Sequence, residues 1–317
     1  MKFYMAPLEG VTTYPLRAAH RSCFPGTDRY FTPFISTGKS FLMKKRDCTG
    51  ILPENNGGIE LVPQFLTNDA VSFLRTSETI MTYGWREINL NLGCPYNTVA
   101  AKKRGSGFLK YPDELDRFFD TLFQKAEKDG PAGIRISVKT RIGVEDISEA
   151  AGLMRIYNRY PIAELTIHPR LRREMYSGEP HLDVFGEMLA VSRNPVCYNG
   201  DINTADDFRR LTELFPDLQA VMIGRGLIRY PGLVRELQGG EKASKAELVK
   251  YYHEVLNRTA AVLPDENSRM QRMKEFWKYF GRSFAGSDGH LLDLLKAKNY
   301  AQYQGAAEVL LSCHDAV

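Results

Sequence analysis

The sequence has few cysteines, no long apolar run and almost no excess of either charge. It contains five cysteines among 317 residues, and no two of them form a Cys-x-x-Cys pair. An odd number of cysteines at this spacing is not typical of a disulfide framework or of a zinc or redox motif. We therefore expect reduced thiols and no metal site.

No segment approaches the roughly 18 consecutive apolar residues that a membrane span requires. The first ten residues, MKFYMAPLEG, reach a glutamate and a glycine too early for a signal peptide. We expect a cytoplasmic protein that does not bind membranes and shows no sign of an obligate protein partner. The net charge of +4 is the balance of 42 basic and 38 acidic residues, so total charge alone does not identify a nucleic-acid-binding protein.

Short apolar or β-branched runs alternate with segments that carry apolar residues at helical spacing. The expected strands cover residues 3–6, 30–35, 59–66, 87–92, 134–138, 164–167, 196–198 and 220–223, and helices are expected at 113–128, 147–160 and 204–215 among others. No Gly-x-Gly-x-x-Gly motif follows the first strand, which argues against an open dinucleotide-binding sheet. The alternation predicts an α/β fold, a (β/α)8 TIM barrel over residues 1–240.

A different pattern begins after Gly239 and Gly240. Candidate helices follow one another at 245–263, 267–284, 291–298 and 302–312, with no strand between them. They predict a small C-terminal helical bundle over residues 241–317. In its second helix Met270, Met273, Trp277 and Phe280 form an apolar stripe, which we interpret as core.

Polar and glycine-containing motifs follow the predicted strands. They are APLEG (6–10), Gln64, NLGCP (91–95), KTRIG (139–143), HPR (168–170), NGD (199–201) and GRG (224–226). A lone Asn-Gly or Gly-Arg-Gly is more often an ordinary turn. Because the active sites of TIM barrels lie where the strands end, seven such motifs in register predict one site at that face.

The last two motifs occupy the position where this fold commonly binds phosphate. They contain Asn199, Gly200 and Asp201 after the seventh strand, and Gly224 and Arg225 after the eighth. Glycine lets backbone amides approach phosphate oxygens, and an arginine adds a forked cation. The sequence therefore predicts a phosphorylated cofactor, with Asn199 or Asp201 near a ribityl or ribose hydroxyl.

Three further residues are candidates for the chemistry. Cys94 lies between a glycine and a proline at a strand end, where a thiol can act as an acid or a nucleophile. Lys139 could form a Schiff base, bind phosphate or stabilise a reduced flavin. His168 is either a satisfied core histidine or a site residue. The remaining cysteines are interpreted as packing or surface residues.

Basic residues cluster on the loops of the same face. The first cluster, after the second strand, includes Lys39 and Arg46. Two further clusters are predicted to contact the substrate: Lys102, Lys103 and Arg104 after Cys94, and Arg170 with its neighbours after the sixth strand. In the bundle, Lys274, Lys278 and Arg282 are spaced to share a helix face. Charge distributed in this way favours a polyanionic substrate, and we expect RNA contact.

Taken together, these motifs resemble the dihydrouridine synthase family. The resemblance rests on MAPLEGVT, the Gln64 segment, NLGCP followed by Gly105-Ser106-Gly107, VKTRIG, the His168-Pro169-Arg170 segment ending in Tyr176-Ser177-Gly178, YNGDI and IGRG, in the family's order and spacing over residues 3 to about 230. It departs from the family at Leu8, where methionine is common, and at Pro169, where glycine or alanine is frequent.

The resemblance implies a specific reaction. FMN, reduced by NADPH, would pass a hydride to C6 of a uracil flipped out of tRNA, while Cys94 protonates C5 as general acid. Asn91 and Arg141 would orient the uracil, and the helical bundle would bind RNA. The cofactor would be contacted by Ala6, Pro7, Leu8, Gln64, Lys139 and His168, and at its phosphate by Asn199, Gly200, Asp201, Gly224 and Arg225.

Several alternatives remain open at this point. A dihydrouridine synthase could act on ribosomal RNA, because the departures at Leu8 and Pro169 leave the target in doubt. A related FMN barrel could reduce a small molecule, although the basic loops would then have no role. An RNA-binding protein with an inactive barrel leaves Cys94 and Lys139 unexplained, and a Schiff-base aldolase gives Cys94 no function.

Overall fold

The computed structural model describes residues 1–37 and 43–316, so Lys39 lies outside the described residues. Ten strands form one sheet in the order β3-β5-β6-β7-β8-β9-β10-β1-β2-β4, and every neighbouring pair is parallel. The strands are β1 (Lys2–Met5), β2 (Arg29–Phe31), β3 (Ile35–Ser36), β4 (Leu61–Val62), β5 (Gln64–Leu66), β6 (Glu87–Leu92), β7 (Arg135–Gly143), β8 (Leu165–Leu171), β9 (Val196–Tyr198) and β10 (Ala220–Ile223).

The sheet closes through two interrupted strands. β2 pairs with β4, and β3 pairs with β5, so the second predicted strand runs beside the third over both of its parts. Only Pro63 separates β4 from β5; it has no N–H to give to a ladder, and its carbonyl accepts from the Asn89 amide at 2.9 Å. Counted as continuous strands, the sheet is a ring of eight, and the predicted TIM barrel is confirmed.

Two strands are longer than the sequence predicted. The expected ends at 138 and 167 are wrong, because β7 and β8 continue to Gly143 and Leu171. The ladder between them persists to the pair Gly143 and Leu171, with an irregularity after Arg141. The KTRIG and HPR motifs are therefore strand residues, and Lys139 and His168 lie on the barrel wall rather than in loops.

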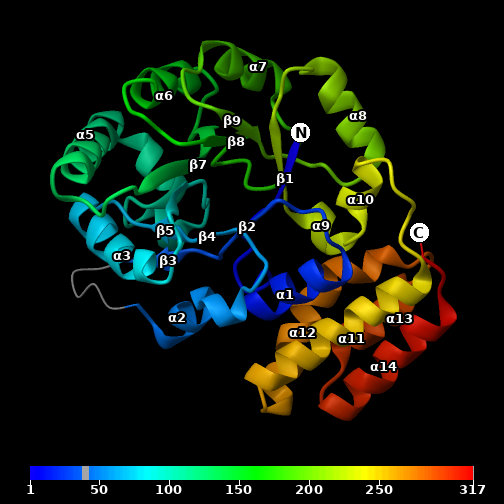
Figure 1. Ribbon diagram of the computed structural model, residues 1–317. Helices are drawn as coiled ribbons and strands as arrows, with labels where there is room; N and C mark the ends of the chain where they lie inside the picture. The colour runs from blue at the N-terminus through cyan, green and yellow to red at the C-terminus, as the bar shows by residue number, and fades with distance from the viewer. Residues whose placement is uncertain (38–42, 317) are drawn as a thin grey trace.

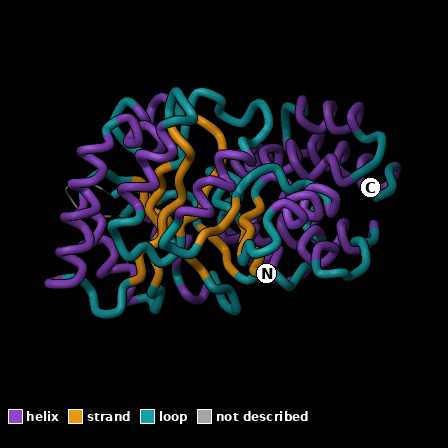
Figure 2. The backbone as a smooth tube through the Cα atoms, turned by 90° about the horizontal axis from the view of Figure 1, so that it is seen from above, coloured by secondary structure: helices purple, strands orange, loops and turns teal. Residues whose placement is uncertain are grey.

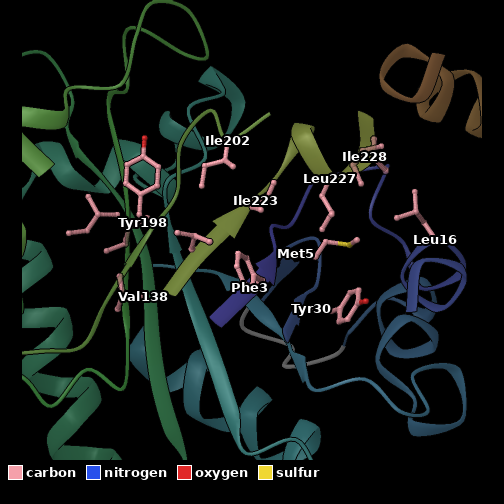
Figure 3. Packing of buried hydrophobic residues seen from close by; sticks show 14 of the residues in the cluster. Phe3, Met5, Leu16, Tyr30, Val138, Tyr198, Ile202, Ile223, Leu227 and Ile228 are labelled. Atoms are coloured by element: carbon pink, nitrogen blue, oxygen red, sulfur yellow. The ribbon is translucent and has the colours of Figure 1, made fainter. Parts of the chain in front are cut away.

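Alternation along the strands divides the apolar residues into two cores. Tyr4 of β1 and Met222 of β10 belong to a small cluster inside the barrel, with Cys197 of β9. Phe3, Met5 and Ile223 point the other way, into a large cluster beneath the helices. Figure 3 shows these outward side chains close to Leu227 and Ile228 of α9. This is the period-two pattern of a strand with both faces buried.

Helices surround the ring of strands (Figures 1 and 2). They are α1 (Tyr14–Cys23), α2 (Lys45–Ile51), α3 (Ala70–Thr82), α4 (Asn97–Ala100), α5 (Pro112–Asp129), α6 (Glu149–Tyr157), α7 (Leu182–Val191), α8 (Ala205–Leu214), α9 (Arg225–Arg229) and α10 (Leu233–Leu237), with short 3-10 turns at Pro53–Asn55 and Gly105–Lys110. α8 begins with a capping box in which Thr204 and Asp207 satisfy each other's amides, as the cap predicted at Thr204 requires.

Four further helices follow the barrel and pack against one side of it through α1 (Figure 1). They are α11 (Lys245–Val262), α12 (Glu266–Phe280), α13 (Asp288–Lys296) and α14 (Tyr300–Cys313), with a 3-10 turn at Gly281–Ser283. Tyr251 of α11 makes edge contacts with His20 and Phe24 of α1. Met273, Trp277 and Phe280 are fully buried, so the predicted apolar stripe is core. Among the described residues, no helix is long and apolar enough to cross a bilayer.

Candidate active site

A cavity of about 370 Å³ lies at the carboxyl ends of the barrel strands, where the polar motifs were expected to meet. Its volume is within the range of small-ligand sites. The predicted residues that line it are Ala6, Pro7, Leu8, Gln64, Asn91, Cys94, Lys139, Arg141, His168, Asn199, Gly200, Asp201, Gly224 and Arg225. The structure thus brings together the candidate acid, all the candidate cofactor residues and both candidate uracil residues.

A chain of side-chain amides runs across the wall of the cavity. Asn91 donates to Gln64 Oε1 at 2.6 Å, Gln64 donates to Asn89 Oδ1 at 2.8 Å, and Asn89 donates to Ser137 Oγ at 3.0 Å. Each amide is buried, so its hydrogen bonds fix which end is oxygen and which is nitrogen. Asn91 and Gln64 are therefore presented to a ligand in one defined orientation.

The loop that carries Cys94 is held at several points. Asn91 Oδ1 accepts from the backbone amides of Gly93 and Cys94 at 3.0 and 2.9 Å. The Cys94 carbonyl accepts from the amide and the hydroxyl of Ser106. Gly105 has a positive φ of 56°, and a Cβ there would lie 2.7 Å from the Cys94 carbonyl oxygen. Only glycine allows this approach, so the Gly105-Ser106-Gly107 motif positions the thiol.

Cys94 is buried, with 8% of the residue exposed. Burial raises its pKa, against the weaker opposing effects of the Tyr96 amide and of Arg141. A thiol with a raised pKa stays protonated at neutral pH. The arrangement favours a proton donor over a thiolate nucleophile, although the sequence left both open.

Arg141 is buried and supports this loop from the barrel wall. Its guanidinium donates to three backbone carbonyls, those of Gly93 at 2.9 Å, Leu171 at 2.9 Å and Met175 at 2.6 Å. Burial lowers its pKa to about 10, which leaves it a cation at neutral pH. Two of its five N–H groups are not used by these bonds, so it can still donate to a ligand in the cavity.

Lys139 projects into the same cavity from β7. Burial, and then the charge of Arg141, lower its pKa to about 7. An ammonium with such a pKa gains most from an anionic or electron-rich neighbour, because that neighbour restores the charged form. The geometry suits a group that stabilises negative charge on a bound ligand.

The neutral form of His168 is defined by its neighbours. Burial, and then the charges of Lys139 and the nearby arginines, lower its pKa well below the usual value. Arg170 Nη1 lies 3.2 Å from His168 Nε2 and can only donate, so Nε2 is the acceptor and the ring proton is on Nδ1. The histidine thus lines the cavity with a fixed tautomer.

Asp201 links two arginines beside the predicted phosphate loops. It accepts from Arg170 and, at 2.5 Å, from Arg225. Burial opposes its ionisation, but the hydrogen bond and charge of Arg170, with Arg225, outweigh it and lower the pKa of Asp201. Arg225 is thereby held at the cavity with its side chain 39% exposed.

Arg170 was predicted to contact substrate, and the structure places it elsewhere. Its side chain is fully buried, and it donates to the carbonyls of Ser177 and Gly178 as well as to Asp201. Because those bonds and His168 use its donors beneath the surface, Arg170 is a positioning residue rather than an RNA contact.

The phosphate loops pack so tightly that only glycine fits. A Cβ on Gly200 would lie 2.5 Å from the Tyr198 hydroxyl, and one on Gly226 would lie 2.1 Å from the Ile202 carbonyl. α9 starts at Arg225, immediately after Gly224, and the amides of a first helical turn have no partners within the helix. Backbone N–H groups and Arg225 thus meet at one end of the cavity, as a phosphate cradle requires.

The remaining basic candidates lie outside the cavity. Lys102 and Arg282 are exposed, Arg104 is half-buried, Lys103 is paired with Glu114 at 2.7 Å, and Lys278 is paired with Glu275 at 2.6 Å. The prediction for Lys274 is wrong: it is 8% exposed, and its ammonium donates to the Ala297 carbonyl at the end of α13. That interaction turns the side chain into the bundle.

The cavity-lining residues that were not assigned a role from the sequence include Glu9, Tyr96, Tyr176 and Tyr279. Tyr176 lies between the guanidinium groups of Arg141 and Arg225, 5.4 and 5.3 Å from its ring. Tyr96 follows the Cys94-Pro95 motif directly, which was a usable signal. Tyr279 comes from α12, and nothing local predicts that a bundle residue reaches the barrel site.

Comparison with known proteins gives the same family as the motifs. The family model for dihydrouridine synthase (Dus) matches residues 4–308. The chain belongs to the dihydrouridine synthase family. A "tRNA-dihydrouridine(16) synthase" of Aquipseudomonas alcaligenes is 28% identical over 243 residues, 75% of each chain. A "Probable tRNA-dihydrouridine synthase" of Staphylococcus aureus (strain Mu50 / ATCC 700699) is 28% identical over 311 residues, 95% of this chain and 90% of the relative.

Solved structures with the same barrel are more distant in sequence. Morphinone reductase superposes with a TM-score of 0.55 at 12% identity, covering 77% of this chain and 87% of its own. The old yellow enzyme from Trypanosoma cruzi superposes with a TM-score of 0.55 at 10% identity, covering 82% and 93%. At this level of identity the likeness concerns the fold.

Proposed function

We propose that the protein is an FMN-dependent tRNA-dihydrouridine synthase that uses NADPH as its reductant. The observation that carries the proposal is that the protonated Cys94 thiol shares one cavity with Lys139, His168 and the phosphate loops. We assign residues 1–240 as the catalytic domain and 241–317 as an RNA-binding domain. The names of the relatives support tRNA as the substrate.

The donor set and the shape of the cavity fit FMN. Arg225 and the close-packed glycine loops suit the phosphate, and Asn199, whose amide donates to the Met222 carbonyl at 2.7 Å, leaves its oxygen for a ribityl hydroxyl. Gln64, Lys139 and His168 would surround the ring system, and Ala6, Pro7 and Leu8 would provide an apolar wall. Reduced FMN, when bound, would supply the hydride that adds to C6 of uracil.

Cys94 supplies the proton in this scheme. Its sulfur gives a proton to C5 of the uracil ring and is left as a thiolate, which recovers a proton from solvent between turnovers. The buried thiol suits this role because a general acid has to hold its proton until the substrate arrives. Lys139 and Arg141 lie close enough to lower the energy of the thiolate that results.

Asn91 and Arg141 are proposed to orient the base. Asn91 is fixed by Gln64 and by the amides of the Cys94 loop, and Arg141 is fixed by three carbonyls. A rigid pair of this kind can read the polar edge of a uracil that has left the RNA stack. Lys102, Lys103, Arg104, Lys278 and Arg282 are proposed to contact the RNA backbone outside the cavity.

The test is dihydrouridine formation in tRNA that lacks the modification, with NADPH, for wild type and Cys94→Ala. We expect the variant to keep its flavin absorbance and to lose at least about 100-fold in the rate of product formation. Cys313→Ala, at an exposed thiol, is the matched control and should act like wild type. Equal rates for Cys94→Ala and wild type would contradict the proposal.

A parallel assay separates the other substrates. Product in ribosomal RNA but not in tRNA would move the activity to that RNA. NADPH consumption that is accelerated by small enones and unaffected by any RNA would indicate a small-molecule reductase.

A further inference from the structure

A second cavity of about 480 Å³ lies next to the catalytic one. It is bounded on the barrel side by residues 9–17, Pro33, Ile35 and α2, and on the other side by Thr259, Val262, Leu263 and Arg272 of the C-terminal helices. Figure 1 shows α1 between α2 and the helices α11 and α12, which is where these walls meet. The cavity therefore exists only because the bundle is docked on the barrel.

The two cavities adjoin each other. Glu9 and Pro33 line both of them. Between them the chain at Gly10 is fastened to the bundle, because Arg272 of α12 donates to the Gly10 carbonyl. A ligand chain that enters the catalytic cavity thus passes directly beside the second one.

The exposed surface of the second cavity is mostly apolar. Tyr14, Pro15, Pro33, Val262 and Leu263 contribute aromatic, ring or branched side chains, and Val262 is 38% exposed. An aromatic side chain such as that of Tyr14 stacks against a nucleobase without regard to sequence, and the apolar residues around it extend this surface.

Positive charge surrounds these walls. Lys45, Arg46, Arg272 and Arg17 line the cavity, against the acids Glu9 and Asp47. Arg46 pairs with both acids, at 3.5 and 3.0 Å, but its single charge offsets only one of the two carboxylates. The four cations therefore outnumber the two acids. The remaining cations leave the cavity positive, which suits a phosphate-bearing ligand.

Arg17 contributes a buried positive charge that bonds no carboxylate among the described residues. Its side chain is 1% exposed, and the acceptors that the described part of the chain gives it are neutral: the carbonyls of Thr12 and Gly50 and the amide oxygen of Asn56. Its Nε has no partner among the described residues. A buried cation bonded only to neutral groups is costly for a purely structural role, and a bound anion nearby would offset that cost.

We propose that the second cavity binds an unstacked nucleotide of the same RNA, next to the uridine in the catalytic cavity, with its base on the apolar wall and its phosphate toward Lys45 and Arg272. This inference rests on the proposed function. An enzyme that extrudes one base from a folded RNA leaves its neighbours without a stacking partner. The second cavity gives one neighbour a new stack and so stabilises the open form.

The test is the affinity of the full-length protein for end-labelled, unmodified tRNA, measured by fluorescence anisotropy at fixed ionic strength. Val262→Glu places a negative charge in the cavity, and Gly50→Leu fills it, since a Cβ on Gly50 has no atom within 4 Å. Both should raise Kd about tenfold or more, the magnitude of one lost base stack. Their catalytic cavities, and hence flavin absorbance, should be unchanged.

Two matched variants serve as controls. Val309→Glu introduces the same charge at an exposed valine of α14, and Gly289→Leu introduces the same side chain at an open glycine of α13; neither residue lines the catalytic cavity or the second cavity. Both should bind tRNA like wild type. Circular dichroism checks that each variant folds, and Gly50→Leu decides the matter if Val262→Glu does not fold.

The possible outcomes distinguish this inference from the function on which it rests. If wild type forms dihydrouridine but the cavity variants bind tRNA as tightly as their controls, the second site is wrong and the function stands. If the variants bind tRNA normally but slow the oxidation of NADPH, the cavity serves the reductant and the inference is overturned. If the variants lose tRNA affinity while wild type forms no dihydrouridine, the site stands and the function fails.

Discussion

The two ends of the barrel hold charged residues in different ways. The closed end is the one at which the strands begin. There Arg29 pairs with Glu60 at 2.7 Å and with Glu87 at 3.3 Å, and the Tyr4 hydroxyl donates to Glu164 at 2.9 Å. At the open end, Lys139, Arg141, Arg170 and Arg225 line or underlie the cavity, and Asp201 is the carboxylate that binds two of them. The closed end joins its charged and polar side chains to one another, although Glu87 Oε1 and Glu164 Oε1 have no hydrogen-bond partner among the described residues, whereas the open end directs an excess of positive charge toward a ligand.

This difference has a physical cost. Burial lowers the pKa of Lys139 and Arg141 at the open end, and it raises the pKa of Glu164 at the closed end. A protein that needed only stability would neutralise both ends equally. Changes at the closed end should therefore act on stability, and changes at the open end should act on ligand binding.

The largest expected effect comes from Arg29→Met at the closed end. It leaves the carboxylate of Glu87, whose side chain is 8% exposed, with only Arg135 as a cationic partner, and the Arg135 side chain is 54% exposed. The free energy of unfolding should fall by about 3 kcal/mol, while FMN affinity stays unchanged. Chemical denaturation and FMN titration of refolded protein measure the two quantities.

Arg209→Met, in an exposed ion pair with Asp206, is the control and should have little effect. Weaker FMN binding in Arg29→Met would break the distinction between the ends.

Arg225→Leu at the open end should weaken FMN binding and leave the stability of the protein nearly unchanged. Its side chain is 39% exposed, so its pairing with Asp201 adds little stability. Loss of a charged phosphate contact should weaken FMN binding by about 2 kcal/mol, or roughly 30-fold. Flavin fluorescence quenching measures the affinity. A variant that binds FMN like wild type but unfolds more easily would show that Arg225 is structural.

The buried thiol of Cys94 should react more slowly than the exposed thiol of Cys313. Cys94 is buried with a raised pKa, and Cys313 is exposed. Because the thiolate is the reacting form, iodoacetamide at pH 8 should modify Cys94 at least about tenfold more slowly than Cys313. Peptide mass spectrometry over a time course gives both rates in one sample. Faster labelling of Cys94 would indicate an activated nucleophile, and the acid role would be wrong.

The smallest effect concerns Lys139 and pH. Its folded-state pKa of about 7 lies below the ordinary value of 10.5. Between these values the unfolded chain holds a proton that the folded chain lacks, so stability rises with pH across that interval. Lys139→Met should therefore stabilise the flavin-free protein most at pH 6, by on the order of 1 kcal/mol, and progressively less toward pH 10.

Denaturation midpoints at pH 6 and pH 9.5 measure this difference. Lys110→Met, at an exposed lysine, is the control and should change neither midpoint appreciably. An equal stability increment for Lys139→Met at both pH values would mean that Lys139 keeps its proton throughout.

The sequence predicted the order of the strands because apolar runs mark the barrel wall. It did not predict how far β7 and β8 extend. Their ends carry Thr140, Arg141, His168 and Arg170, polar residues that are buried, and two of them, Arg141 and His168, line the cavity. In the sequence such residues resemble a loop, and only the ladder between β7 and β8 shows that they are strand.

The cavity residues were predictable for a related reason. Polar side chains at strand ends must converge in a closed barrel, so Cys94 and Arg225 could be placed before any coordinates were known. Residues whose role depends on packing between distant segments could not be predicted from the sequence. Lys274 lies one helical turn before Lys278 on the same predicted helix face, but its ammonium donates a hydrogen bond to the Ala297 carbonyl at the end of α13. Arg170 is likewise buried by contacts with Ser177 and Asp201.

The central claim is that the open end of the barrel keeps its positive charge to bind the phosphate of FMN. The most direct measurement compares the affinities of the flavin-free protein for FMN and for riboflavin, which differ only in that phosphate. The account predicts that FMN binds at least about 100-fold more tightly. Equal affinities, or a protein that binds neither flavin, would contradict it.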